Sequence, residues 1–171
     1  MREPEASRTV YPGRLLRVDV ESWPALGDWE VAKQPGAAAV VPITPDGDVL
    51  LVRQFRPAVR DVLTEIPAGM LDVQGEDAVS CATRELFEET GFRHRSIEFL
   101  GGVYVSPGTT DHFVHLFWAL TDHEETGAPE TSIEVLRRPL ADMVAAARAG
   151  RVRDAKTALG LLLVANRTGG P

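Results

Sequence analysis

One stretch of this sequence decides its fold: Glu76-Asp77-Ala78-Val79-Ser80-Cys81-Ala82-Thr83-Arg84-Glu85-Leu86-Phe87-Glu88-Glu89-Thr90-Gly91. Its apolar residues Val79, Ala82 and Leu86 are three and four positions apart, as on one face of an α-helix. Acidic residues open the stretch and Gly91 closes it, which is typical of helix ends because acids favour the N-terminus and glycine suits the C-terminal cap. We therefore predict a helix over residues 76–90.

This helix carries an unusual amount of negative charge. Glu85 lies three positions before Glu88 and four before Glu89, and each like-charge pair at such spacing costs about 0.2 to 0.5 kcal/mol. A solvated surface helix is the ordinary interpretation of a charge run. However, these acids gather near the helix C-terminus, where the dipole disfavours them, and a glycine-containing loop precedes the helix. We interpret the cluster as a cation site.

The chemistry of the cluster indicates which cation and which reaction to expect. Carboxylate and carbonyl oxygens are hard ligands that suit Mg²⁺ or Mn²⁺, whereas zinc favours cysteine and histidine. Such an ion bridges phosphate oxygens and lowers the pKa of a bound water. Hydrolysis of a phosphoanhydride is the matching reaction.

Composition limits the alternatives. The 171 residues are enough for one domain, and the net charge of -7 provides no basic surface for nucleic acid. The apolar stretches are shorter than the roughly 20 residues of a membrane span, and the N-terminus lacks a secretory signal, so we expect a cytoplasmic protein without membrane contact. The single cysteine, Cys81, excludes an internal disulfide and is expected to be a packed apolar residue.

Periodicity and turn residues predict the remaining elements. We expect a mixed sheet with helices on its faces, an α/β fold of the α+β type, in one domain over residues 1–171. Residues 15–20 and 29–33 should form an N-terminal hairpin, and residues 1–9 and 168–171 should fray. Further strands are expected at 37–43, 49–52, 62–66, 100–105, 113–120 and 133–137, with a loop at 68–75, a helix at 140–149 and another from the cap Asp154 to residue 165.

A family resemblance appears in the residues around the acidic helix. Gly69 to Glu76, followed by Arg84 to Phe92, closely resembles the Nudix box, G-x5-E-x7-R-E-U-x-E-E-x-G-U with U aliphatic. Six residues separate Gly69 from Glu76 here, so the loop before the helix holds an insertion, and Phe92 occupies the last aliphatic position. The resemblance implies a Nudix-type α/β/α sandwich with an N-terminal β-hairpin extension.

The resemblance also implies how a metal would be held. Glu85 and Glu89 would be metal ligands, Glu76 would support the metal shell, and the backbone carbonyl of Ala68 or Gly69 would add a further ligand.

The rest of the box has a structural role in the family. Glu88 would pair with Arg84 to hold the helix and the site together.

A second set of motifs resembles one subgroup of this family. Residues 34–42, 53–56 and Ser106-Pro107-Gly108 look like the ADP-ribose and ADP-sugar pyrophosphatases. This implies cleavage of ADP-ribose to AMP and ribose 5-phosphate. Asp111 is followed by His112, where the subgroup usually has an acidic residue. The alternatives are another sugar nucleotide or dinucleotide coenzyme as substrate, or a non-catalytic ADP-ribose-sensing module on the same fold.

Candidate substrate residues follow from the chemistry of ADP-ribose. Arg53 and Arg56 could clamp the diphosphate, although exposed arginines at a strand end are the plain alternative. Trp23 and Trp29 are candidates for stacking on adenine, with core packing as the alternative for one of them. Gly108, in the Ser-Pro-Gly motif, is also expected at the substrate.

The subgroup implies two more features. A glutamate from the loop after the box would orient the attacking water, and Glu130 is the first candidate, with Glu125 and Glu134 behind it. The N-terminal strands, within residues 1–35, would be exchanged between two subunits, so we expect a homodimer with the catalytic core at about residues 36–167.

Overall fold

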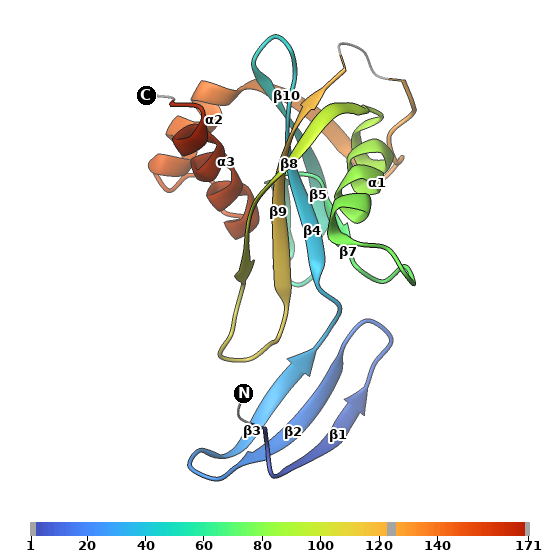
Figure 1. The fold of residues 1–171 in the computed structure, drawn as a ribbon, viewed down its shortest axis with the longest axis vertical. Helices are drawn as coiled ribbons and strands as arrows, with labels where there is room; N and C mark the ends of the chain where they lie inside the picture. The colour runs from blue at the N-terminus through green and yellow to red at the C-terminus, as the bar shows by residue number, and fades with distance from the viewer. Residues whose placement is uncertain (1–2, 123–125, 170–171) are drawn as a thin grey trace.

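The computed structural model describes residues 3–122 and 126–169 and divides them between a small N-terminal sheet and a larger α/β body (Figure 1). The N-terminal sheet contains the antiparallel strands β1 (Ala6–Pro12), β2 (Arg17–Trp23) and β3 (Gly27–Lys33) and extends away from the body. The predicted hairpin of residues 15–20 and 29–33 is confirmed as β2 and β3. The expected fraying of residues 1–9 is wrong, because residues 6–12 form a third strand on this hairpin. The sequence concealed β1 because all its residues are exposed, which removes the apolar alternation of a half-buried strand.

The body is built on a seven-stranded sheet. Its main path runs β10-β5-β4-β9-β8, with β6 paired to β5 and β7 paired to β4. The β4 and β9 strands are parallel and the other pairings in this sheet are antiparallel, which confirms the expected mixed sheet. The bounds are β4 (Ala37–Ile43), β5 (Asp48–Arg56), β6 (Asp61–Glu65), β7 (Ala68–Met70), β8 (His94–Tyr104), β9 (Phe113–Thr121) and β10 (Glu134–Pro139).

Helices cover both faces of this sheet. Helix α1 (Ala78–Thr90) packs on one face, and α2 (Leu140–Arg148) and α3 (Ala155–Arg167) pack on the other (Figure 1). The alternation along β4 explains the two layers of core: Val40 faces the cluster with α1, whereas Val41 faces the cluster with α2 and α3. The α/β/α sandwich is thereby confirmed.

The ends of α1 follow the physical chemistry of helix termini. The Asp77 side chain accepts a hydrogen bond from the Ser80 N–H (2.8 Å), so Asp77 is the N-cap. Gly91 takes the left-handed conformation (φ 75°) and its N–H donates to the Phe87 carbonyl. The helix therefore begins at Ala78, two residues later than predicted, and Glu76 lies before it. Cys81 is buried and not in a disulfide, as expected.

Residues 68–75 were predicted to be a loop, but Ala68–Met70 form strand β7. The two residues that connect β6 to β7, Ile66 and Pro67, are tied to the body on two sides. The Ile66 N–H donates to the Thr157 hydroxyl of α3 (2.8 Å), and the Val40 N–H donates to the Pro67 carbonyl (3.0 Å). Ala68 then starts the short strand β7 against β4. These bonds fix Ala68 and Gly69 beside α1. No helix in the described part of the chain is long and apolar enough to cross a membrane.

The core on the α3 side should carry much of the stability. Leu161 is fully buried there, so Leu161→Ala is expected to lower the free energy of unfolding by about 2 to 5 kcal/mol through lost burial and an unfilled cavity. Urea unfolding followed by circular dichroism measures the change. Leu120→Ala is the matched control, because Leu120 is 40% exposed. An equal loss for the two variants would contradict this assignment of the core.

Candidate active site

Glu76, Glu85, Glu88 and Glu89 form the acidic cluster, and the carboxylate at its centre is held out of water. Glu89 is 6% exposed, and its carboxylate accepts a hydrogen bond from the Ala68 N–H (3.0 Å). Burial raises the pKa of Glu89 to about 7, the negative charge of Glu85 adds to the rise, and the Ala68 hydrogen bond opposes it. The folded chain therefore holds a carboxylate whose charge is poorly compensated.

Glu85 lies beside the same strand end. A Cβ atom on Gly69 would lie 1.8 Å from Glu85 Oε1, so only glycine leaves room for this carboxylate. Burial also raises the pKa of Glu85, and the neighbouring Arg84 guanidinium works against that rise. The buried Glu89 and the partly buried Glu85 thus meet the backbone of β7 as a pair of acids.

Arg84 connects the other acids of the cluster. Its Nε and Nη2 atoms each donate to a Glu76 oxygen at 2.9 Å, and Nη1 donates to Glu85 (2.5 Å) and Glu88 (3.1 Å). The bidentate partner of Arg84 is therefore Glu76, whereas Glu88 makes one contact at the exposed rim. These bonds hold the pKa of the Glu76 carboxyl below its usual value. Glu76 is engaged by Arg84 through both of its carboxylate oxygens.

A second group of charges lies close to Glu89 and was missed from the sequence. Glu65 is 1% exposed and accepts hydrogen bonds from Arg56 Nε (2.7 Å) and Nη2 (2.8 Å). It also forms an ion pair with Lys156. Burial alone would raise the pKa of Glu65, but these two cations outweigh it and lower that pKa. Both cations also lower the pKa of Glu89. A glutamate directly before the apolar Ile66, at the end of a predicted strand, was the available sequence signal.

The two arginines predicted to clamp the diphosphate do not lie together. They are three positions apart on β5, so their side chains leave opposite faces of the sheet. Arg56 contacts Glu65 beside the acidic cluster, whereas Arg53 contacts Glu134 of β10 at 3.0 Å. The joint clamp is therefore wrong, and Arg56 is the arginine placed near Glu89.

The candidate loop glutamates take different positions. The Glu130 N–H donates to the Glu88 carbonyl (2.9 Å), which ties this loop to the last turn of α1, and the Glu130 carboxylate accepts from the Ser132 hydroxyl (2.7 Å). Glu134 is paired with Arg53. Glu125 lies outside the described residues. Glu130 is thus anchored by its backbone beside the acidic helix.

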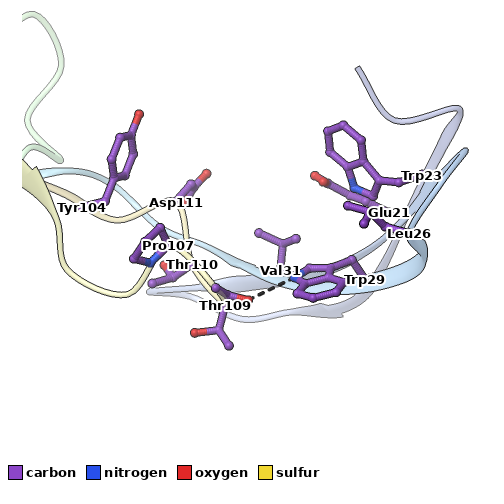
Figure 2. A pocket seen from close by; sticks show the side chains of 11 residues that line it. Glu21, Trp23, Leu26, Trp29, Val31, Tyr104, Pro107, Thr109, Thr110 and Asp111 are labelled. Carbon is purple, nitrogen blue, oxygen red and sulfur yellow. Dashed lines mark hydrogen bonds between the residues drawn. The ribbon is translucent and has the colours of Figure 1, made fainter. Parts of the chain in front are cut away.

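Three of the predicted substrate residues line one cavity of about 430 Å³. Figure 2 shows Trp23 and Trp29 of the N-terminal sheet on one side of this aromatic cavity and Tyr104 and Pro107 on the other. Trp29 Nε1 donates to the Gly108 carbonyl at 3.0 Å, so Gly108 closes the cavity beside the indole. The aromatic cavity shares no lining residue with the acidic cluster.

The residues of the acidic cluster suit a hard divalent cation. Glu85 and Glu89 offer carboxylate oxygens, and burial raises the pKa of both groups because their negative charge is poorly compensated. The backbone of Ala68 and Gly69 lies beside them. Within the described residues, no set of three or more Asp, Glu, His or Cys side chains is grouped as a metal site. The remaining ligands would therefore be backbone carbonyl, water or substrate oxygens, as is usual for Mg²⁺.

A mixed sheet between helices, with paired carboxylates of one helix against a strand end, is an arrangement suited to metal-assisted chemistry on phosphates. Residues 33–158 match the family model of the NUDIX domain, and the chain belongs to this family. The sequence resemblance to the Nudix family is thereby confirmed.

Individual relatives agree with this membership. The chain is 37% identical over 162 residues to the ADP-ribose pyrophosphatase of Bacillus subtilis (strain 168), with 90% of this chain and 86% of that protein covered. It is 36% identical over 135 residues to the GDP-mannose pyrophosphatase of Cronobacter sakazakii (strain ATCC BAA-894), with 72% and 70% covered. The crystal structure of an ADP compounds hydrolase has the same fold, with a TM-score of 0.77 at 23% identity, covering 99% of this chain and 96% of that one.

The raised pKa of Glu89 predicts a pH-dependent stability in metal-free buffer. Folding raises this pKa from 4.5 to about 7, so the stabilisation is complete below pH 4.5 and is lost as the pH rises through about 7. Glu89→Gln removes this dependence. The free energy of unfolding of the wild type minus that of Glu89→Gln should therefore fall by about 3 kcal/mol at most between pH 4.5 and pH 8.

Urea unfolding at a series of pH values in the presence of a chelator measures this difference. Glu88→Gln removes the same charge from a side chain on α1 that is 53% exposed, and it serves as the control. A wild-type minus Glu89→Gln difference that does not change with pH would contradict the buried state of Glu89.

Proposed function

We propose that this chain hydrolyses the diphosphate linkage of ADP-ribose to AMP and ribose 5-phosphate, with Mg²⁺ or Mn²⁺ as its cofactor. The observation that carries the proposal is the pair of carboxylates set against the backbone of Ala68 and Gly69, of which Glu89 is buried and Glu85 partly buried. Support for the substrate comes from the Bacillus subtilis relative, whose name is ADP-ribose pyrophosphatase.

The acidic cluster provides distinct roles for its members. Glu85, Glu89 and the carbonyl of Ala68 would hold the ion. When bound, such an ion polarises the diphosphate and makes hydroxide available near neutral pH. Arg84 holds Glu85 through a hydrogen bond and is itself held by both oxygens of Glu76, so Glu76 acts as a positioning residue.

Two further residues are proposed to act on the substrate. Arg56 would bind the diphosphate, because its guanidinium lies near Glu89 and its pairing with Glu65 uses only two of its five N–H donors. Glu130 would orient the attacking water, because its backbone is bonded to the last turn of α1.

The adenine is proposed to bind in the aromatic cavity between Trp23 and Trp29 of the N-terminal sheet and Tyr104. No lining residue of this cavity belongs to the acidic cluster. In a homodimer, the aromatic cavity of one subunit could lie beside the acidic cluster of the other subunit. Adenine and diphosphate would then be bound by different subunits. The protruding, exposed strand β1 suits such an exchange.

Turnover by the purified protein tests the role of the acidic cluster. Purified protein with Mg²⁺ or Mn²⁺ should convert ADP-ribose to AMP and ribose 5-phosphate, and Glu85→Gln and Glu89→Gln should each lower kcat by about a hundredfold or more, because each removes an ion ligand. Product chromatography over a panel that includes GDP-mannose and dinucleotide coenzymes measures the preference. Glu98→Gln, at an exposed carboxylate on β8, should retain normal rates.

Three outcomes would decide against the proposal in different ways. Intact ADP-ribose with turnover of GDP-mannose would make the chain a pyrophosphatase of another sugar nucleotide. Tight ADP-ribose binding without any product would make it a sensing module. Normal rates for Glu85→Gln would remove the acidic cluster from the chemistry.

Mixed dimers test whether the aromatic cavity acts in trans. Glu85→Gln and Trp29→Ala subunits, each impaired alone, should regain activity when they are unfolded together and refolded as a mixture. A mixed dimer would then hold one site with both residues intact, so recovery should reach roughly a quarter of the wild-type rate. Size-exclusion chromatography with light scattering checks that the chain is dimeric. A dimer without recovery would place the aromatic cavity in the same subunit's site.

A further inference from the structure

A second cavity, of about 480 Å³, opens on the α2 and α3 side of the sheet. Its walls come from β5, β6, β10, α2 and the segment between α2 and α3, which lie far apart in the sequence. Four arginines line it: Arg53, Arg138, Arg151 and Arg153. We call this the arginine cavity. Such a concentration of positive charge is unexpected in a chain with a net charge of -7.

The charges at the arginine cavity are only partly compensated. Arg53 is paired with Glu134 (3.0 Å) and Arg153 with Asp61 (2.7 Å), but neither carboxylate is part of the lining. Each pairing is a single contact that orients the guanidinium and leaves other N–H donors available.

The remaining two guanidiniums have no carboxylate partner among residues 3–122 and 126–169. Arg138 donates to the Arg137 carbonyl (2.9 Å). Among the described residues, the cavity arginines that form ion pairs with carboxylates are Arg53 and Arg153, and none is found for Arg138 or Arg151. The one acid in the lining, Asp154, is already used, because it accepts hydrogen bonds from Thr157 and pairs with Lys156 (3.0 Å). The arginine cavity therefore has unmatched positive charge.

The walls of the arginine cavity are not only polar. Leu51 is fully buried at its floor, and Leu136, Met143 and Val152 are partly buried against the same core. Guanidinium groups bind phosphate oxygens in a bidentate manner, and aliphatic walls favour a ligand with a carbon skeleton. The volume is within the usual range of small-molecule sites.

We propose that the arginine cavity binds a small organic phosphate at a site separate from the acidic cluster. The acidic helix α1 covers the opposite face of the sheet, and the lining contains none of the acidic-cluster or aromatic-cavity residues. A ligand in the arginine cavity would therefore not compete with a substrate at Glu85 and Glu89. The proposal does not depend on which substrate the enzyme hydrolyses.

The experiment is isothermal titration calorimetry of the full chain at low ionic strength with a chelator present. Fructose 1,6-bisphosphate is the main probe, because it carries two phosphates on a carbon skeleton and has no phosphoanhydride to hydrolyse. Inorganic pyrophosphate, titrated separately, tests whether the carbon skeleton is needed. The variant is Arg138→Ala/Arg151→Ala. The control is Arg95→Ala/Arg167→Ala, which removes the same charge at two exposed ion pairs on other surfaces.

We expect one bisphosphate per chain, with affinity lowered about tenfold or more in Arg138→Ala/Arg151→Ala and unchanged in the control and in Glu85→Gln. Four results would overturn the proposal: no bisphosphate binding to the wild type, equal weakening in the control, full affinity in the cavity variant, or binding of pyrophosphate alone. Thermal melts of the unliganded variants verify that each is folded, because the substituted arginines are exposed and outside the core.

Discussion

The structure depends on a carboxylate that folding takes out of water. Glu89 is buried against the end of β7, where the Ala68 N–H is its hydrogen-bond donor, and its pKa is raised accordingly. An ionised carboxylate in such a position is unfavourable unless positive charge lies nearby. Arg56 and Lys156 supply part of that charge, and a divalent cation between Glu85 and Glu89 would supply the rest. The site is therefore suited to a divalent cation.

The fold places this carboxylate by joining elements from both faces of the sheet. Thr157 of α3 accepts the Ile66 N–H, Pro67 accepts the Val40 N–H, and β7 then passes directly under α1. Lys156 of α3 reaches Glu65 at the end of β6. Helix α3 on one face of the sheet thus fixes the start of β7, and Glu89 of α1 on the other face binds to it. Gly69 completes the arrangement, because any side chain there would displace Glu85.

The sequence predicted features whose physical signals are local. The α1 helix, its closing Gly91 and the strand at 37–43 followed from periodicity and turn chemistry, and the box motif identified the acids that meet at β7. Strand β1 was missed because its residues are exposed on both faces and show no alternation. The Glu65–Lys156 pair was missed because its members are 91 residues apart, and nothing near either residue indicates the other. Strand alternation already predicts that Arg53 and Arg56, three positions apart, point to opposite sides of β5. The predicted diphosphate clamp overlooked this alternation.

The most direct measurement of the central claim is the proton release that accompanies cation binding. Because the pKa of Glu89 is about 7, part of the population is protonated at neutral pH, and a cation that binds Glu89 must displace that proton. Calorimetric titration with Mn²⁺ at pH 7, repeated in buffers of different ionisation enthalpy, quantifies the released protons. The account predicts a fractional proton release in the wild type that disappears in Glu89→Gln. Cation binding with no proton release, or with release that is unchanged in Glu89→Gln, would contradict it.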